Sequence, residues 1–353
     1  MSPDEALYEK VARKVLSESL RMKKGETLTI ETWNNGLPFA RRLVVEARRI
    51  GAIPIVILED ESAYIEGVKV TPKDILGSMG KHEHNLLAGS DAYVFIPGPP
   101  LGAYSPRLSR QEFTDSTKYN HSWYEAAEKA RLRGARFPFG YVGKEYARLY
   151  RKRPEEIVRH QLKAALADFP SISYSGRAIG QALKDGAQAT LLTRAGKLEF
   201  ALKGDLEVDD GIVDEKDVEG GYNMTYVPPG NVSKQVDPTS GKGSVALSPS
   251  VTRLGLMNDA KLEFEGGKLV RWKSRGSSKM LTELVEAIQP EKRILSSINV
   301  GINPSMRYEN GQDRMVSGAI ALGGFGLWGI VRRGNLSVAE RILVQDGKLV
   351  LSS

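Results

Sequence analysis

The sequence contains no cysteine and only four histidines among its 353 residues. Without cysteine the chain has no disulfides, thiolate metal sites, iron–sulfur clusters or cysteine nucleophiles. It also lacks a run of about 18 apolar residues, the length that a membrane span requires. Its first residues are charged, unlike the apolar core of a secretory signal. We therefore expect a cytoplasmic protein with no membrane partner.

The overall composition, with 41% hydrophobic and 26% charged residues, is typical of a globular protein. The length is sufficient for two domains. The net charge of +7 favours anionic partners only weakly, because net charge governs non-specific association and not fold.

The first half of the chain alternates between helical and extended patterns. The apolar run Asp91–Ile96 predicts a buried strand, which is followed by the rigid loop Pro97–Pro100. Ligands in open α/β sheets usually bind at the carboxyl ends of the strands, where this loop lies. This alternation is typical of βαβ units and a parallel sheet. The expected elements are a helix through Leu7, Val11 and Val15, a strand at Leu28–Glu31, a helix from Pro38 to about Gly51, strands at Pro54–Leu58 and Arg136–Phe139, and helices over about 122–133 and up to Asp168.

The residue pattern changes after Phe169-Pro170: helical spacing of apolar residues becomes scarce, and turn-forming residues become frequent. Only Lys279–Ile288 has a clear helical pattern there. We therefore predict an α/β domain over residues 1–168 and a mainly β domain over 169–353. The expected strands are Thr190–Thr193, Lys197–Leu202, Lys261–Phe264, Leu269–Lys273 and Arg341–Gln345.

Two short motifs have competing interpretations. Gly324–Gly329 matches G-x-G-x-x-G, but the residues that follow do not predict the helix that a dinucleotide site requires, so we expect a glycine-rich turn. His82-Glu83-His84 is the densest group of metal-capable side chains, and His121 is a conceivable third ligand. On a helix, residues two apart face opposite sides, which favours a solvated polar face.

Residues 129–163 carry eleven Lys and Arg against three Glu, with Tyr141, Tyr146 and Tyr150 between them. This pattern suits an anionic partner, or a pair of amphipathic helices whose basic side chains cover apolar surface. No nucleic-acid-binding module is recognisable, so we expect no nucleic-acid partner.

Seven segments keep a common order and spacing: Gly25–Leu58, Asp91–Pro99, Ala135–Ala147, Asn223–Val245, Val300–Pro304, Gln312–Gly323 and Gln345–Leu349. Together they resemble the thermophilic aminopeptidase T family of metallopeptidases, which includes the aminopeptidase S type. The family shares its fold with 2,5-dihydroxypyridine dioxygenase. The resemblance implies a Rossmann-like parallel-sheet domain followed by a mainly β (α+β) domain. It also implies a homodimer in which the second domains enclose the cleft.

The resemblance further implies where metal ligands would lie. Family peptidases hold two divalent metals in the second domain with two Glu, two His, an Asp and a Tyr. Here Asn231 takes the place of the first Glu, Ser297 of the second and Ala319 of one His, and Asn335–Leu343 contains neither His nor Asp. Neutral or absent donors do not compensate the charge of a divalent cation. We therefore predict no metal or other cofactor, and iron of the dioxygenase type is disfavoured equally.

We interpret the chain as an aminopeptidase-T-like protein without the dinuclear site, a metal-independent enzyme or a ligand-binding pseudo-peptidase for a small molecule or peptide end. Arginines can hold a carboxylate or phosphate. A desolvated lysine can act as a base or Schiff-base amine. The candidate catalytic residues are Lys234, Asp237 and Asp313, and the candidate substrate-binding residues are Asn231, Asn303, Arg307, Arg314 and Trp328.

Two alternatives remain open. One is an active metallo-aminopeptidase or iron dioxygenase whose Zn, Co or Fe ligands have moved to His82 and His84. The other is a non-catalytic protein that binds an anion or nucleic acid through the basic residues of 129–163.

Overall fold

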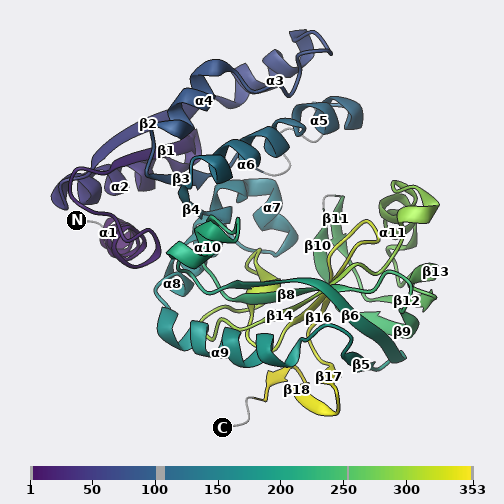
Figure 1. Cartoon of the computed structure of the whole chain (residues 1–353). Helices are drawn as coiled ribbons and strands as arrows, with labels where there is room; N and C mark the ends of the chain where they lie inside the picture. Colours follow the sequence, from purple (N-terminus) through teal and green to yellow (C-terminus); the bar gives the residue numbers. More distant parts are fainter. Residues whose placement is uncertain (1–2, 101–107, 253, 351–353) are drawn as a thin grey trace. The chain divides into compact units, whose positions relative to one another are not determined.

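The computed structural model describes residues 3–100, 108–252 and 254–350. The chain forms two compact units (Figure 1). Unit 1 comprises Met1–Leu166 and Gly211–Pro228, and unit 2 comprises Ala167–Asp210 and Pro229–Ser353. Each unit is described separately below.

Unit 1 is built on a five-stranded parallel sheet in the order β2-β1-β3-β4-β7. The predicted parallel βαβ arrangement is therefore confirmed. The strand expected at Arg136–Phe139 ends earlier, because Pro138 has no N–H for the ladder and starts a 3-10 turn instead. The strands are β1 (Thr27–Trp33), β2 (Ile53–Glu59), β3 (Ala92–Ile96), β4 (Arg133–Arg136) and β7 (Met224–Tyr226).

One face of this sheet forms the main apolar core of unit 1. Phe39, Phe137 and Phe139 meet in it with ring centroids 4.8–5.7 Å apart. Helix α2 packs on β1 and β2, and α1 packs on α2 and α8. The helical elements are α1 (Pro3–Lys14), η1 (Val15–Ser19), η2 (Asn34–Gly36), α2 (Leu37–Arg49), α3 (Glu61–Val70), α4 (Lys81–Ala88), α5 (Arg110–Ser116), α6 (Tyr119–Lys129), η3 (Pro138–Tyr141), α7 (Lys144–Leu149), α8 (Pro154–Ala164) and α10 (Glu215–Glu219).

Residues 211–228 return from the second half of the sequence to unit 1. Their strand β7 pairs in parallel with β4, so that Met224 lies beside Gly134 and Tyr226 beside Arg136. The predicted division into residues 1–168 and 169–353 does not include this return of the chain to unit 1. The pairing joins strands about 90 residues apart, and a three-residue strand carries no local signal for its partner.

Unit 2 is dominated by antiparallel strands, as the sequence predicts for a mainly β domain. Its largest sheet follows the path β16-β15-β14-β8-β6-β5-β17-β18-β19, with β9, β12 and β13 attached off this path. The strands are β5 (Gln188–Thr193), β6 (Gly196–Asp209), β8 (Asn231–Val236), β9 (Lys242–Leu247), β10 (Ser250–Thr252), β11 (Gly255–Met257), β12 (Ala260–Glu265), β13 (Lys268–Ser274), β14 (Ser297–Gly301), β15 (Ile320–Gly323), β16 (Gly329–Val331), β17 (Asn335–Val338), β18 (Arg341–Gln345) and β19 (Lys348–Leu349).

Unit 2 contains a long helix that the sequence analysis did not predict. Helix α9 (Phe169–Ala182) packs along β6 (Figure 1), in addition to the expected helix α11 (Ser278–Glu286). Its serines and glycines have low helix propensity, so the helical spacing of its apolar residues was not recognised in the sequence. The glycines allow close packing, since a Cβ on Gly176 would lie 2.5 Å from Cγ1 of Val208. The remaining helical turns are η4 (Pro290–Lys292) and η5 (Asp313–Met315).

The glycine-rich motif Gly324–Gly329 connects the antiparallel strands β15 and β16 without a following helix. A glycine-rich turn was expected there. Across the described parts of the chain, every helix is too short or too polar to be a candidate membrane span.

Candidate functional site

A polar face crosses the unit 2 sheet where β6, β8 and β14 lie side by side. Asn231 pairs with Asp209 on one side and Gly301 on the other, and Ser233 pairs with Glu207 and Asn299. Directly paired residues of antiparallel strands project to the same side of a sheet. These side chains therefore form one surface, which we call the polar floor: Glu207, Asp209, Asn231, Ser233, Ser297 and Asn299.

The polar floor contains a buried acceptor without a hydrogen bond. Asn299 is only 1% exposed, and its Oδ1 has no partner among the residues that the structure describes. Leaving such an amide oxygen unpaired costs about 1–3 kcal/mol, so it favours a ligand or water that donates an N–H or O–H. Asn299 was missed by the sequence analysis, although the period-two polar pattern Ser297-x-Asn299 was a usable signal.

Arg314 reaches this floor from a loop that lies directly on the sheet. A Cβ at Gly301 would come within 2.1 Å of the Val316 carbonyl oxygen and 2.6 Å of that of Arg314, so glycine is required for this approach. The Arg314 guanidinium carbon lies 5.7 Å from the centroid of the Trp328 ring. That ring packs over Gly323, which pairs with Ser297 of the polar floor.

Arg314 also affects the pKa of a carboxylate on the polar floor. Desolvation raises the pKa of Glu207, and the nearby Arg314 guanidinium partly offsets this rise. Trp328 is 43% exposed, so part of its ring is accessible to a ligand. The arrangement thus combines a guanidinium, an accessible aromatic face and an unpaired amide oxygen.

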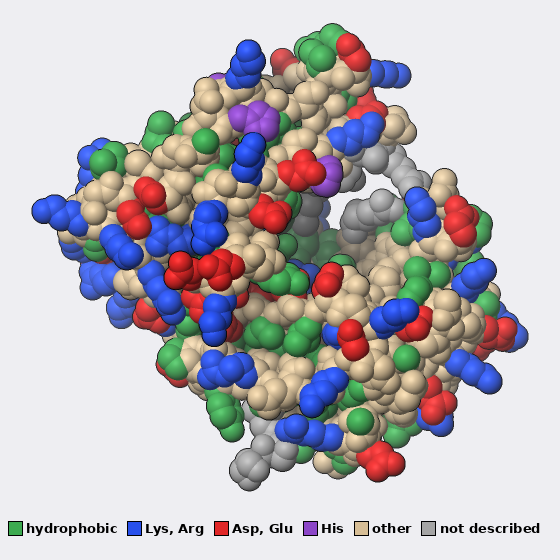
Figure 2. All heavy atoms as spheres, in the orientation of Figure 1, with side chains coloured by type: hydrophobic (Ala, Val, Ile, Leu, Met, Phe, Trp, Pro, Cys, Tyr) green, Lys and Arg blue, Asp and Glu red, His purple; other side chains and the backbone are tan. Residues whose placement is uncertain are grey.

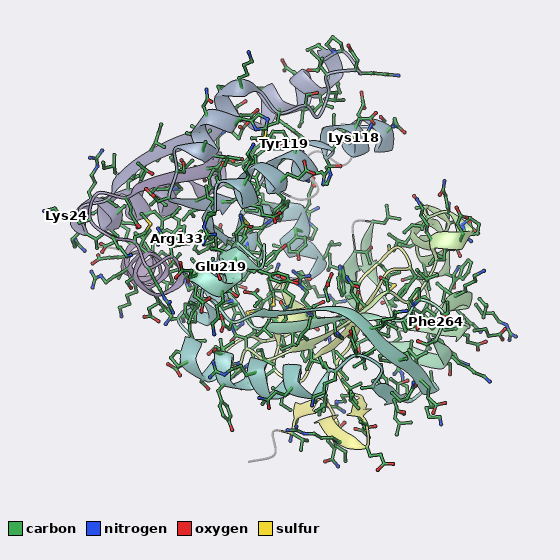
Figure 3. The ribbon with its side chains drawn as sticks, viewed as in Figure 1. Lys24, Lys118, Tyr119, Arg133, Glu219 and Phe264 are labelled. Carbon is green, nitrogen blue, oxygen red and sulfur yellow. The ribbon has the colours of Figure 1, made fainter. Side chains whose placement is uncertain are left out.

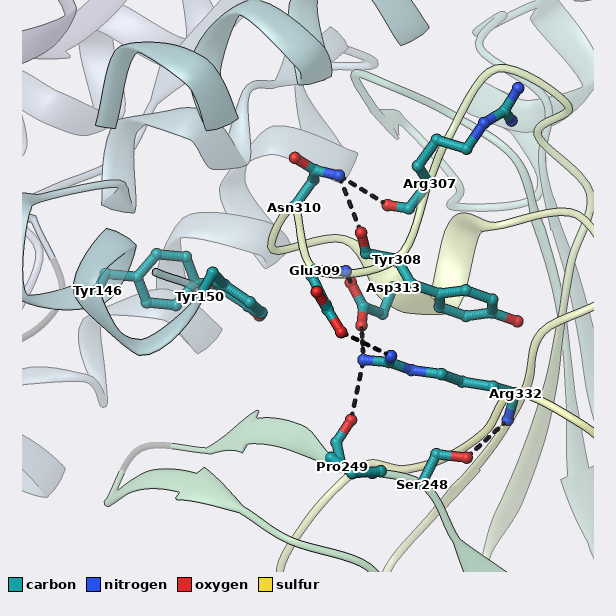
Figure 4. A network of polar contacts seen from close by, with 10 residues as sticks. All are labelled: Tyr146, Tyr150, Ser248, Pro249, Arg307, Tyr308, Glu309, Asn310, Asp313 and Arg332. Atoms are coloured by element: carbon teal, nitrogen blue, oxygen red, sulfur yellow. Dashed lines mark hydrogen bonds and ion pairs between the residues drawn. The ribbon is translucent and has the colours of Figure 1, made fainter. Parts of the chain in front are cut away.

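A second polar network holds the loop that carries Arg314 (Figure 4). Arg332 contacts Glu309 at 2.9 Å and Asp313 at 3.3 Å, and donates to the Pro249 carbonyl at 3.0 Å. Its guanidinium lies 4.8 Å from the centre of the Tyr308 ring. Asp313 also accepts the Glu309 backbone N–H at 2.8 Å. These contacts join the loop to the segment before β10.

Burial shifts the titration of two groups in this network. It raises the pKa of Asp313, and Arg332 opposes that rise. It raises the pKa of Tyr308 to about 12, with Asp313 adding to the effect. The Tyr308 hydroxyl is buried without a hydrogen-bond partner within the described parts of the chain. Asp313 therefore lies in a structural ion pair, although the sequence analysis named it as catalytic.

Two further candidates also stabilise this loop. Asn303 is fully buried, donates to the Pro229 carbonyl at 2.7 Å and accepts from the backbone N–H groups of Ser305 and Met306. Arg307 is exposed, and its guanidinium donates to the carbonyl of Pro304 at 2.8 Å. The structure thus places Asn303 as a support of the loop and leaves Arg307 at its surface.

The structure separates Lys234 and Asp237 from the polar floor. Lys234 pairs with Leu206, on the sheet face that α9 covers, where it binds Asp185 at 2.5 Å and the Gly204 carbonyl. Asp237 accepts the backbone N–H and hydroxyl of Thr239 in a turn, which lowers its pKa. Strand alternation explains the position of Lys234, since residues 231 and 234 have opposite parity. Asp237 is separated because β8 ends at Val236.

The histidines of the metal alternative lie in unit 1. His82 and His84 are exposed on α4, where residues two apart project to different sides. His121, on α6, contacts Glu125 at 3.2 Å. Over residues 3–100, 108–252 and 254–350, no three His, Cys, Asp or Glu side chains are grouped so as to hold a metal ion.

The basic segment 129–163 is spread over the end of α6, β4, α7 and α8. Arg133 contacts Glu26 at 2.9 Å, Arg136 donates to the Tyr141 hydroxyl at 2.7 Å and Arg159 binds Asp4 at 2.9 Å. These three cations are thus already engaged by groups of unit 1.

Unit 1 has its own polar cluster beneath α4 and α6. Tyr93 donates to Glu31, and Tyr119 donates to Glu83 at 2.7 Å (Tyr119 is labelled in Figure 3). Burial raises the pKa of Glu31 to about 7, with Tyr93 opposing the rise and Glu59 adding to it. These carboxylates are held by tyrosines of the same unit, which indicates a closed structural cluster.

Comparison with known proteins shows the fold. Neither a protein-family model nor a curated protein sequence matches the chain. Wild-type AmpT from Thermus thermophilus is similar in structure, with a TM-score of 0.70 and 16% identity over 98% of this chain and 99% of that one. The 2,5-dihydroxypyridine dioxygenase from Pseudomonas putida has a TM-score of 0.66 and 13% identity over 100% and 99%. The predicted aminopeptidase-T-like fold is confirmed, and the chain shares it with both proteins.

Proposed function

We propose that unit 2 binds a small carboxylate-bearing ligand, such as the carboxyl end of a peptide, on its polar floor without a divalent metal. The observation that carries this proposal is the position of Arg314, beside Trp328 and close to Glu207. A guanidinium matches a carboxylate through two parallel N–H···O bonds. The ligand class fits the interpretation of the chain as a pseudo-peptidase or a metal-independent enzyme.

Other side chains on and beside the polar floor indicate which further chemical groups the ligand has. The Oδ1 of Asn299 is buried and unpaired, so an N–H or O–H of the ligand, or of a water bound with it, would satisfy this oxygen. The exposed ring of Trp328 offers a surface for an apolar or planar part of the ligand. Peptides and hydroxy or amino acids combine these features.

The residues present do not fit the dinuclear metal site that the fold family implies. Asn231 and Ser297 are neutral, and Ala319 offers no side-chain donor at the third position. Unit 2 contains no histidine, because the last one in the sequence is His160. The guanidinium of Arg314 repels a divalent cation on the same face, while such a site needs compensating anionic ligands. We infer that Arg314 supplies the positive charge for the ligand instead.

Ligand affinity measured by calorimetry tests this proposal. Glycylglycine is the probe, and glycylglycinamide, which lacks the carboxylate, is its matched control. Arg314→Ala should weaken glycylglycine binding about tenfold or more, with Arg314→Lys intermediate, because the bidentate contact is lost. Arg307→Ala is the control variant, since Arg307 lies on the same loop but turns its guanidinium to backbone carbonyls.

Three results would contradict the proposal. The first is equal binding of glycylglycine and its amide, and the second is unchanged affinity in Arg314→Ala. The third is near-stoichiometric divalent metal in the purified protein, measured by mass spectrometry after dialysis against zinc or cobalt.

A further inference from the structure

Arg136 is the last residue of β4, at the carboxyl end of the unit 1 sheet, and aromatic side chains surround it. Its guanidinium carbon lies 5.1 Å from the ring centroid of Phe95, 5.8 Å from that of Tyr226 and 5.9 Å from that of Tyr141. Phe95 and Tyr226 flank Arg136 because they are its direct partners in the ladders that β4 forms with β3 and β7. Together with Tyr124 of α6, these four residues form what we call the arginine cage.

The polar contacts of Arg136 within the cage are to neutral groups. Its Nη2 donates to the Tyr141 hydroxyl at 2.7 Å, and its Nη1 donates to the Tyr124 hydroxyl at 3.4 Å. Among the residues that the structure describes, Arg136 forms no ion pair with a carboxylate. A partly buried cation without a counter-ion is unfavourable, so the cage favours the binding of an anion.

Two other arginines of the same basic segment have carboxylate partners. Arg133, labelled in Figure 3, contacts Glu26 at 2.9 Å, and Arg159 binds Asp4 at 2.9 Å. Figure 2 also shows Asp and Glu side chains among the Lys and Arg of the α1 and α2 region. Arg136 differs from these cations because phenol hydroxyls take the place of the carboxylate.

Glu31 lies in the same row of the sheet but compensates the charge of Arg136 only in part. It pairs with Phe95 across β1 and β3, and it accepts a hydrogen bond from the Tyr93 hydroxyl. Burial raises the pKa of Glu31 to about 7, and the attraction of Arg136 makes only a small opposing contribution. A large share of Glu31 is therefore uncharged at neutral pH, which leaves positive charge at Arg136 for a ligand.

The cage is accessible and presents hydrogen-bond donors. Tyr124 is 40% exposed, and Arg136, Tyr141 and Tyr226 are partly exposed. A tyrosine hydroxyl that accepts from Arg136 can still donate its own O–H. Burial raises the pKa of Tyr124, so this hydroxyl keeps its proton at neutral pH. The guanidinium and the two hydroxyls beside it thus offer several donors to one anion.

We propose that the arginine cage binds a phosphoryl group, at a site in unit 1 that is separate from the carboxylate site proposed in unit 2. A phosphoryl group has three acceptor oxygens, enough for the guanidinium and both hydroxyls, whereas a carboxylate has two. Ligands of open parallel sheets bind beyond the carboxyl ends of the strands, where Arg136 lies. The exposed ring of Tyr124 offers a surface for the organic part of a phosphate monoester.

Calorimetry on the full chain with phenyl phosphate tests this proposal. Benzoate, which carries the same ring and a carboxylate, should bind more weakly. Inorganic phosphate distinguishes the two sources of the group, since tighter binding of phenyl phosphate indicates a monoester and equal binding indicates free phosphate. Arg136→Gln should weaken phenyl phosphate binding about tenfold or more, because the charge-assisted hydrogen bonds are lost. Tyr141→Phe keeps the ring and should weaken binding about threefold to tenfold.

Control variants separate the cage from other cations. Arg159→Gln removes an exposed arginine of the same basic segment and should bind phenyl phosphate as the wild type does. Arg314→Ala should also keep this affinity, and Arg136→Gln should keep its affinity for glycylglycine, which separates the sites of the two units. Far-ultraviolet circular dichroism checks that Arg136→Gln is folded. Phenyl phosphate should raise the thermal unfolding midpoint of the wild type but not that of Arg136→Gln.

Four results would overturn the proposal. The wild type binds neither phenyl phosphate nor inorganic phosphate, or it binds benzoate as tightly as phenyl phosphate. Alternatively, Arg136→Gln and Tyr141→Phe both keep the wild-type affinity, or Arg159→Gln loses as much affinity as Arg136→Gln.

Discussion

Both units carry a polar face on a sheet with an apolar core, and the two faces are satisfied differently. In unit 1, Glu31 and Glu83 are bound by tyrosine hydroxyls beneath α4 and α6. In unit 2, the Oδ1 of Asn299 is unpaired within the described chain, and Trp328 is exposed beside Arg314. Buried polar groups by themselves therefore do not identify a site. An unsatisfied acceptor on the same sheet face as a guanidinium and an exposed ring is the more specific indication.

The largest expected effect is on the stability of unit 1, and it should leave ligand binding by unit 2 unchanged. Phe137→Ala empties the centre of the three-phenylalanine cluster of unit 1, which should lower the free energy of unfolding by about 3–5 kcal/mol. Urea unfolding measures the change. Glycylglycine affinity should stay at the wild-type level under native conditions, and a parallel loss of affinity would show that the two units do not act separately.

Two helical glycines, one in each unit, should respond to alanine with opposite sign. Gly176→Ala places a methyl group 2.5 Å from Val208, and overpacking of this kind costs about 1–3 kcal/mol. Gly67→Ala, in α3, meets nothing within 4 Å and should stabilise by about 0.5–1 kcal/mol. Thermal and urea unfolding test both. Equal effects at the two positions would contradict the close packing of α9 on β6.

A pH titration should distinguish the two polar faces. The pKa of Glu31 is raised from 4.5 to about 7, so the native state binds more protons than the unfolded chain between these values. Stability should therefore fall as pH rises from 4.5 to 7 and level off above. Glu31→Gln should raise the free energy of unfolding at pH 8 by about 1–3 kcal/mol, and change little at pH 4.

Glu207→Gln in unit 2 is the matched variant for this titration. Its pKa is also raised, but the residue is exposed at the surface and Arg314 opposes the rise, so the pH dependence of stability should change less than for Glu31→Gln. A larger effect for Glu207→Gln than for Glu31→Gln would reverse the proposed contrast between a closed and an open face.

The smallest effect on stability should come from Trp328→Ala. The contact of its exposed ring with Arg314 contributes only about 0.5–1 kcal/mol to stability. Its effect should appear instead in a weaker affinity for glycylglycine. Lys234→Met is the complementary variant, since it removes a contact on the α9 face and should reduce stability without changing that affinity. Similar affinities in Trp328→Ala and wild type would exclude the ring from the ligand site.

Much of the fold could be predicted because its signals are local. The strands at β1, β2 and β3 and the helix α2 follow from apolar periodicity and from proline and glycine positions. Helix α9 escaped prediction because its packing depends on glycines that are poor helix formers in isolation.

The sites were predictable only in part. Asn231, Arg314 and Trp328 were named from the sequence, and the structure brings them to one sheet face. Asn299 was missed, and Lys234 lies on the opposite face. Residue type indicates which side chains can carry chemistry, but it does not indicate which strands become neighbours.

The amino-acid composition is enough to say that unit 2 has no cysteine or histidine side chain to bind a metal. Local patterning is enough to predict a parallel sheet in the first region and antiparallel strands in the second. The folded arrangement was needed to show that residues 211–228 join the first sheet and that Arg314 lies by the polar floor. These features escape local patterns because strand pairing is non-local. Each strand alternates its side chains with a period of two, so the register with distant partners decides which residues share a face.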